Sequence, residues 1–180
     1  MSVPSILDIE ASGFGRGSYP VEIGYVLDDG DSQCMLVRPE PGWNHWDPAA
    51  EGLHRIKRAD LLEYGLPGAV VADELNHRLC GRTLYTDAWG HDYSWLAVLY
   101  DAAGRAPTFR LESLHSLLTD SEIARWPALK EQVAIVLGLP RHRACADARL
   151  LQATFGKLRE RGRVDFDRTC GRPSRANTNS

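Results

Sequence analysis

Residues 5–13 read SILDIEASG, an apolar run in alternation with two acids. Such alternation is typical of a β-strand, because successive side chains point to opposite faces of a sheet. Asp8 and Glu10 are two residues apart, so both carboxylates emerge on one face, while Leu7 and Ile9 point into a core. Two adjacent carboxylates repel each other, and a divalent cation such as Mg²⁺ relieves that repulsion by taking carboxylate oxygens as ligands. We therefore expect this strand to carry one half of a metal site.

The composition is that of one globular domain. The chain has 180 residues, of which 43% are hydrophobic and 25% charged, and this length suffices for a sizeable core. A formal net charge of −3 means that the chain has no overall basic field, the feature that would indicate a nucleic-acid partner. Metal-binding carboxylates would themselves make the metal-free chain more acidic, so the charge argues only weakly against such a partner.

The cysteines and the apolar runs predict a cytoplasmic protein. Cysteines occur at 34, 80, 145 and 170 without a C-x-x-C pair, which disfavours a zinc site or a disulfide framework and favours a reducing compartment. The N-terminus lacks the pattern of a signal peptide, and no apolar run approaches the ~20 residues that span a bilayer. We expect no membrane partner.

Apolar periodicity predicts the other elements. Residues 21–27 and 33–37 are expected to form an antiparallel hairpin around the turn sequence at 28–31, and the proline-rich stretch 38–48 an irregular loop. Further strands are expected over 82–86 and 108–111. Helices are expected over 59–64, 70–80, 91–103, 114–118, 122–137 and 144–160. The pattern indicates an α/β fold, a mixed sheet with helices on its faces.

Two later segments carry further acids. Asp92 lies where a predicted strand ends and a helix starts, and ligands of open α/β sheets gather at strand ends. A capping role for Asp92 explains the same position. Later in the chain, His142 lies in a loop and Asp147 early in the helix that follows it. By itself, a histidine in an arginine-flanked loop, such as His142, is more often a surface residue than a catalyst.

Taken in order, these segments resemble the DEDDh 3′–5′ exonucleases, a superfamily that includes proofreading exonucleases, oligoribonuclease and ribonuclease T. Residues 8–14, DIEASGF, are similar to the family motif D-x-E-T-[TS]-G-[LF], with Ala11 in place of threonine. Residues 54–56, HRI, match its H-x-I, and His142-x4-Asp147 matches the last motif. The resemblance runs from Ser5 to about residue 158, with the four acids in the family order.

The middle motif departs from the family pattern H-N-x-x-F-D. Asp87 and Ala88 stand at the places of His and Asn, and His91 stands at that of Phe. Asp92 is assigned as the metal ligand because an aromatic-Leu pair follows it, and Asp87 stays the second candidate.

The resemblance implies a ribonuclease H-like fold. This is a mixed five-stranded sheet, in which three antiparallel strands are followed by parallel strands, with helices flanking the sheet. Residues 1–161 are expected to form the exonuclease domain, and residues 162–180 a flexible C-terminal tail, because they are polar and rich in Gly, Pro, Arg, Asn and Ser.

The resemblance further implies metal-dependent hydrolysis of the terminal phosphodiester at the 3′ end of single-stranded RNA or DNA, with release of nucleoside 5′-monophosphates. Two ions, Mg²⁺ or Mn²⁺, stabilise the attacking and leaving oxygens of such a displacement. Their ligands would be Asp8, Glu10, Asp92 and Asp147. His142 would act as the general base, since an imidazole can accept a proton from water near neutral pH.

Five residues are candidates for substrate binding. Phe14 would stack on the terminal base, or else pack beneath its own loop. Ser12 and the backbone of Gly13 would hold the terminal sugar, and the resemblance alone assigns His54 and Ile56 to the next base. Arginines near the motifs, Arg143 among them, would hold phosphates or simply be solvated.

Two alternatives to the nuclease remain open. The chain could be a catalytically silent exonuclease-fold module that binds nucleic acid or protein, although all five expected site residues are present. It could also be another metal-dependent phosphohydrolase with Asp8 as the nucleophile, which would form a covalent aspartyl-phosphate.

Overall fold

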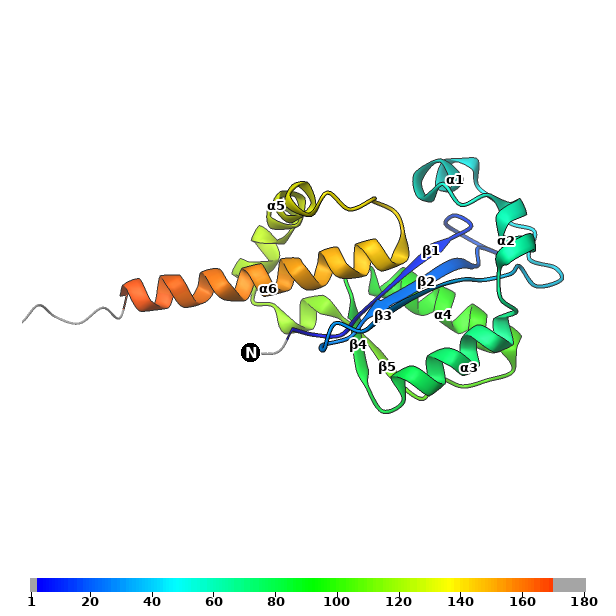
Figure 1. Cartoon of the computed structure of the whole chain (residues 1–180), viewed down its shortest axis with the longest axis horizontal. Coiled ribbons are helices and arrows are strands. Elements are labelled where there is room, and N and C mark those ends of the chain that lie inside the picture. The colour runs from blue at the N-terminus through cyan, green and yellow to red at the C-terminus, as the bar shows by residue number, and fades with distance from the viewer. Residues whose placement is uncertain (1–2, 170–180) are drawn as a thin grey trace, which may run out of the picture.

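A computed structural model describes residues 3–169, which contain a five-stranded mixed sheet with helices on both faces (Figure 1). The strand order is β3-β2-β1-β4-β5. β1, β2 and β3 pair antiparallel, whereas β4 pairs parallel with both β1 and β5. The predicted fold class is therefore confirmed. The strands are β1 (Ile6–Ala11), β2 (Pro20–Val26), β3 (Ser32–Leu36), β4 (Thr83–Thr86) and β5 (Arg110–Ser113).

The helices follow the predicted order, with changes at their bounds. They are α1 (Pro48–His54), α2 (Arg58–Tyr64), α3 (Gly68–Leu79), α4 (Trp89–Ala103), the 3-10 turn η1 (Leu114–Leu117), α5 (Asp120–Leu137) and α6 (Ala144–Thr169). β5 begins two residues later than the strand expected at 108. Within residues 3–169, no helix is both long enough and apolar enough to cross a lipid bilayer.

Helix α1 was not predicted. Asp47 is its N-cap: the carboxylate of Asp47 accepts a hydrogen bond from the Ala49 N–H at 2.8 Å, and Pro48 lies in the first helical turn. Both features favour a helix start. The helix is too short to show apolar periodicity, which explains why the pattern missed it.

Helix α6 is longer than expected. Its backbone stays helical to Thr169, beyond the predicted end at 160 and into the segment expected to be a tail. No proline interrupts this stretch, and a helix that has formed is extended at little cost. The remainder of the predicted tail, residues 170–180, lies outside the described residues.

The two faces of the sheet carry separate cores. On one face, Leu7 and Ile9 pack with Leu75 and Leu99 against α3 and α4, as the alternation in β1 predicted. On the other face, Ile6 packs with apolar residues of α5 and α6. In Figure 1 the two helix pairs lie on opposite sides of the sheet.

A third, smaller core lies beneath α1, α2 and the loop before them. Tyr19, Ile56 and Leu61 are buried there, and Trp43 and Trp46 pack against them. The Tyr19 and Trp43 rings stack with centroids 5.0 Å apart. This core anchors the proline-rich loop beside the end of β1.

The sheet is open next to the end of β1. β1 pairs with β4 at Ile6 and Tyr85, and Asp8 and Glu10 lie farther along β1, beyond that pair. The first turn of α4 follows directly after β4. Acids from β1 and from α4 can therefore approach each other at this end of the sheet.

Candidate active site

The five residues expected to carry the chemistry line one cavity. It has a volume of about 340 Å³ and lies at the carboxyl end of β1, bordered by the starts of α4 and α6. Its walls include Asp8, Glu10, Asp92, His142 and Asp147. The structure thus brings together three segments that are far apart in the sequence.

Strand β1 presents Asp8 and Glu10 on the face opposite to Leu7 and Ile9. Asp8 lies across the ladder from Gly24 of β2. The register shifts between Glu10 and Ala11, directly after the second acid. Such bulges often lie next to active sites, where they end the regular pairing and re-aim side chains.

Asp92 is held in the cavity wall by the end of β4. Its side chain is buried, and it accepts a hydrogen bond from the hydroxyl of Thr86, the last residue of that strand. The same hydroxyl accepts a hydrogen bond from the Ala88 N–H at 3.2 Å. Thr86 therefore links the strand end to the first turn of α4 and orients the carboxylate.

Asp87 has a different environment. Its carboxylate forms an ion pair with the ammonium of Lys130 on α5, at 2.7 Å. Asp87 and Lys130 line a second, smaller cavity of about 180 Å³, which also contacts Asp8 and Asp147. Of the two candidates for the middle acid, only Asp92 lines the larger cavity.

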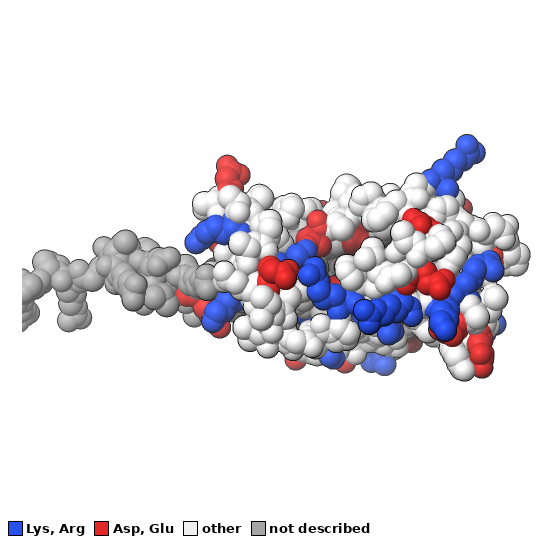
Figure 2. Space-filling view, turned by 90° about the horizontal axis from the view of Figure 1, so that it is seen from above, with Lys and Arg blue, Asp and Glu red and all other residues white. Residues whose placement is uncertain are grey.

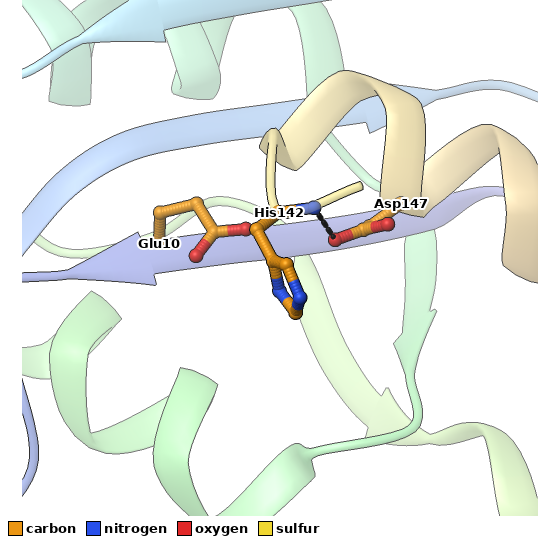
Figure 3. A group of neighbouring side chains, drawn as sticks. All are labelled: Glu10, His142 and Asp147. Carbon is orange, nitrogen blue, oxygen red and sulfur yellow. Dashed lines mark hydrogen bonds between the residues drawn. The ribbon is translucent and has the colours of Figure 1, made fainter. Parts of the chain in front are cut away.

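His142 and Asp147 are joined through the backbone. The His142 N–H donates to a carboxylate oxygen of Asp147 at 3.0 Å, and His142 has a left-handed φ of 60°. Figure 3 shows His142 beside both Glu10 of β1 and Asp147 of α6. Ligand atoms of these three residues all lie within 4.8 Å of one another.

An ion pair with a buried carboxylate joins β2 to the start of α6. Glu22 is buried, and its carboxylate accepts hydrogen bonds from Arg143 Nε and Nη2, the latter at 2.5 Å, and from the Ala144 N–H at 2.8 Å. Glu22 lies directly opposite Glu10 in the ladder, where two like charges would otherwise repel. Arg143 neutralises one of the two acids and so leaves Glu10 for the cavity.

The pairing with Glu22 changes the interpretation of Arg143. The sequence suggested this residue as one of several phosphate contacts, whereas the structure commits its guanidinium to a buried carboxylate. Sequence reasoning also missed Glu22 and Thr86. A charged residue in an otherwise apolar strand is a signal for Glu22, because such an acid requires a partner.

Burial and mutual repulsion raise the pKa values of the cavity acids. Burial, followed by the charge of Asp92, raises the pKa of Asp8 well above its ordinary value. Burial, followed by Asp147, raises the pKa of Glu10 to about 7. Burial raises the pKa of Asp92 to about 7 and also raises that of Asp147. The four carboxylates form an anionic cluster that a cation would stabilise.

The donor set fits hard divalent cations. The four acids offer carboxylate oxygens, the ligands that Mg²⁺ and Mn²⁺ take. The raised pKa values show that the acids are poorly neutralised by the protein itself. The charges of the other three acids contribute to the raised pKa of Asp8, so the four carboxylates are close enough to repel one another. The residues present therefore fit a divalent-metal site.

Three of the five candidate substrate contacts line the cavity: Gly13, Phe14 and His54. Gly13 has a φ of 138°, and a Cβ there would lie 2.6 Å from Asp47 Cβ. Only glycine fits this turn without strain. Phe14 is 64% exposed, so the alternative that it packs beneath its own loop is not supported.

The structure does not bring Ser12 and Ile56 to the cavity. The Ser12 hydroxyl accepts a hydrogen bond from the Tyr19 N–H and contacts His45 Nδ1, both at 3.1 Å. Ile56 is buried in the small core beneath α2. Neither residue belongs to the cavity lining.

His54 has an available donor. Its Nδ1 accepts a hydrogen bond from the Ile56 N–H at 3.0 Å, which leaves the proton on Nε2 in the neutral ring. Within residues 3–169, no acceptor meets hydrogen-bond geometry at that Nε2, although the ring is buried. Burial lowers the pKa of His54, so the neutral form is favoured.

Aromatic rings cover one side of the cavity mouth. His91 and Trp95, one turn apart on α4, stack with centroids 5.6 Å apart, and Phe14 meets His91 edge-on at 5.1 Å. His91 thus occupies an aromatic position, as the phenylalanine of the family motif would. Sequence reasoning noted the substitution but did not assign His91 to the site.

The charge around the cavity is uneven. Figure 2 shows acidic side chains within a hollow on this face and a band of Lys and Arg beside it. Lys130 and Arg141 line the adjoining smaller cavity. Both cations are ion-paired, with Asp87 and Glu131 respectively, so they offset acidic charge beside the cavity.

No protein-family model and no curated protein matches the sequence. Solved structures of exonuclease I do match the fold. They include the Escherichia coli enzyme in complex with a dT13 oligonucleotide (TM-score 0.70, 14% identity, 93% of this chain and 43% of that chain). They also include the same enzyme with a dA16 oligonucleotide (TM-score 0.68, 14% identity, 94% and 43%) and a moderately thermophilic exonuclease I from Methylocaldum szegediense (TM-score 0.68, 15% identity, 93% and 42%).

The present chain spans less than half the length of these structures. At such low identity the likeness concerns the fold. It agrees with the strand order and with the helices on both faces of the sheet. The chain has a ribonuclease H-like fold, the fold of the matched region of exonuclease I.

Proposed function

We propose that this chain is a metal-dependent 3′–5′ exonuclease that hydrolyses the terminal phosphodiester of single-stranded RNA or DNA and releases nucleoside 5′-monophosphates. The observation that carries the proposal is the single cavity into which Asp8, Glu10, Asp92 and Asp147 converge together with His142. The fold likeness supports a nuclease-type hydrolase, because exonuclease I structures with bound oligonucleotides share the arrangement of the sheet and helices.

The four carboxylates would hold the metal. Asp8, Glu10, Asp92 and Asp147 would bind two ions, Mg²⁺ or Mn²⁺, which when bound act as Lewis acids on the attacking and leaving oxygens. Ligand atoms of Glu10 and Asp147 lie within 4.8 Å of each other, and Asp8 and Asp92 would complete the ligand set. Thr86 holds Asp92 in place through its hydroxyl. Arg143 keeps Glu22 from competing with Glu10 for a cation.

His142 would take the proton from the attacking water at a ring nitrogen. Its backbone is tied to Asp147, while its ring faces the cavity beside Glu10 and Asp147 (Figure 3). A general base of this kind contributes typically about 10²–10⁴-fold to the rate. The loop position leaves the ring free to adjust when substrate enters.

The cavity wall suits a terminal nucleotide. Phe14 would stack on the terminal base, a contact worth roughly 1–3 kcal/mol that tolerates any base. The backbone of Gly13 approaches the same space without a side chain, where a sugar would lie. The Nε2 of His54, for which residues 3–169 offer no acceptor in good hydrogen-bond geometry, would donate to a sugar or base oxygen of the substrate.

The test is digestion of 5′-labelled single-stranded RNA and DNA of equal sequence, run side by side with Mg²⁺ or Mn²⁺. We expect stepwise shortening from the 3′ end, nucleoside 5′-monophosphates as products, and a stop at a blocked 3′ terminus. Cleavage of a circular strand, or undiminished cleavage in EDTA, would refute the proposal. A phosphorylated aspartate in the denatured protein would favour the phosphohydrolase, and binding without cleavage would favour the silent module.

A further inference from the structure

Two cysteines lie behind the candidate active site, on the face of the sheet that α6 covers. Cys34 of β3 is the cross-strand partner of Gly24 of β2, so both residues face the same side. Ser32, two residues before Cys34 on the same strand, accepts a hydrogen bond from Arg149 of α6 at 2.7 Å. The side chain of Cys34 therefore points toward α6.

Gly24 lets the first turn of α6 rest directly on the sheet. A Cβ on Gly24 would lie 2.3 Å from the backbone nitrogen of Cys145 and 2.9 Å from its Cα, so no larger residue fits. Cys145 thus lies over Gly24, and Cys34 lies beside Gly24 in the ladder. The two thiols meet across the space that the glycine leaves, and they interact directly.

This placement brings the two thiols close to the arrangement that a disulfide requires. A disulfide needs Cα atoms about 4.4–6.8 Å apart and Cβ atoms that point toward each other. Directly paired residues of an antiparallel ladder have Cα atoms about 4.5–5.5 Å apart, so Cys34 lies about that far from Gly24, and the backbone of Cys145 packs on Gly24. Both sulfurs are free thiols, with Cys34 exposed and Cys145 partly exposed, so a small oxidant can reach them.

We propose that Cys34 and Cys145 form a redox-modification site, which hydrogen peroxide or a similar small two-electron oxidant converts to a disulfide. One sulfur attacks the O–O bond of the peroxide, becomes a sulfenic acid and releases one water. The other sulfur then displaces the sulfenic oxygen, which leaves as a second water with the proton of the attacking thiol. Two thiols lose two electrons and two protons, and one peroxide becomes two waters.

The disulfide would fasten β3 to the first turn of α6, two residues before Asp147. The inference is independent of the proposed nuclease activity, since it concerns the thiols alone. Its test requires neither metal nor nucleic acid. A failure of the nuclease assay therefore leaves it unaffected, and its own failure leaves the nuclease proposal unaffected.

The experiment uses the full chain, reduced and then treated with graded hydrogen peroxide. Remaining thiols are alkylated, and the protein is digested with trypsin without reduction and mapped by mass spectrometry. Trypsin does not cleave between Arg38 and Pro39, so it places Cys34 in the peptide 17–55 and Cys145 in 144–149, whereas Cys80 falls in 79–82 and Cys170 in a separate peptide. Each possible pairing therefore has a distinct mass.

We expect the 17–55 and 144–149 peptides to be linked to each other as the main oxidised product, and dithiothreitol to separate them. The link should vanish in Cys34→Ser and in Cys145→Ser, and persist in the matched control Cys80→Ser. Oxidation of Cys34 and Cys145 to sulfinic or sulfonic acids without the link would overturn the proposal. So would a dominant link between Cys34 or Cys145 and any other cysteine. Because the wild-type digest shows the link directly, a variant that fails to fold does not affect the result.

Discussion

Replacement of Arg143 by alanine should destabilise the protein through Glu22. The side chain of Glu22 is 1% exposed, and the guanidinium of Arg143 supplies most of its hydrogen bonds. After the change, the Ala144 N–H is the remaining partner seen for Glu22. Glu22 also lies opposite Glu10, so an unpaired charge would face a second carboxylate.

The size of the effect follows from the exposure of the two partners. Removal of one partner of a buried ion pair costs about 3–5 kcal/mol, because the other charge stays buried and unpaired. The side chain of Arg143 is 46% exposed, so water can enter the space that it leaves. We therefore expect a loss of about 2 kcal/mol in the free energy of unfolding, below the range for a fully buried pair.

The assay is urea unfolding in EDTA at neutral pH, followed by tryptophan fluorescence. Arg141→Ala is the matched control, since Arg141 pairs with Glu131 on the surface and both side chains are more than half exposed. That change should cost less than about 0.5 kcal/mol. Glu22→Gln should cost about 1 kcal/mol, because the amide still accepts a hydrogen bond and Arg143 can turn into water.

A double-mutant cycle gives the decisive comparison. In the Glu22→Gln background, Arg143→Ala should cost under about 0.5 kcal/mol, since no buried charge is left behind. Two outcomes would contradict this reasoning. Arg143→Ala could lower the free energy of unfolding no more than Arg141→Ala does, or it could lower it equally with Glu22 present and with Glu22 replaced. Either result would mean that the ion pair between Arg143 and Glu22 does not stabilise the protein.

Three further predictions concern the cavity. Asp92→Asn should abolish turnover, whereas Asp87→Asn should keep a substantial part of it, because Asp87 is ion-paired with Lys130. The opposite ranking in a cleavage assay would make Asp87 the metal ligand in place of Asp92. His142→Ala should lower kcat by about 10²–10⁴-fold and leave Mg²⁺ binding nearly intact by calorimetry, whereas near-normal turnover would return it to an ordinary surface residue. In EDTA, the melting temperature should fall as pH rises from about 5 to 8. Burial raises the pKa values of Glu10 and Asp92 to about 7, so the folded protein still holds protons on these acids in that range. The unfolded chain has already released those protons, because its acids titrate near their ordinary pKa values. Added Mg²⁺ should raise the melting temperature more at the upper end of that range. As a control, Glu10→Gln should make the fall shallower but not abolish it, because Asp92 still titrates.

Much of the fold could be predicted from local pattern. The alternation in β1 placed Asp8 and Glu10 on one face and Leu7 and Ile9 in the core, because a strand has a side-chain period of two. Helical periodicity located α3, α4 and α5 to within a few residues. Weaker local signals failed: α1 depends on the cap at Asp47, and α6 continues without an apolar stripe.

The sequence by itself determined which residue types could carry the chemistry and in what order they occur. The tertiary structure decided which of them meet and which are already engaged. Lys130 pairs with Asp87, Thr86 orients Asp92, and Arg143 is held by Glu22 rather than left for phosphate. These contacts depend on how α4, α5 and α6 pack on the sheet, and periodicity carries no information on the partner of a charge. The partner of a charge is decided in the folded state, because a charge that is taken out of water is unfavourable unless it is paired.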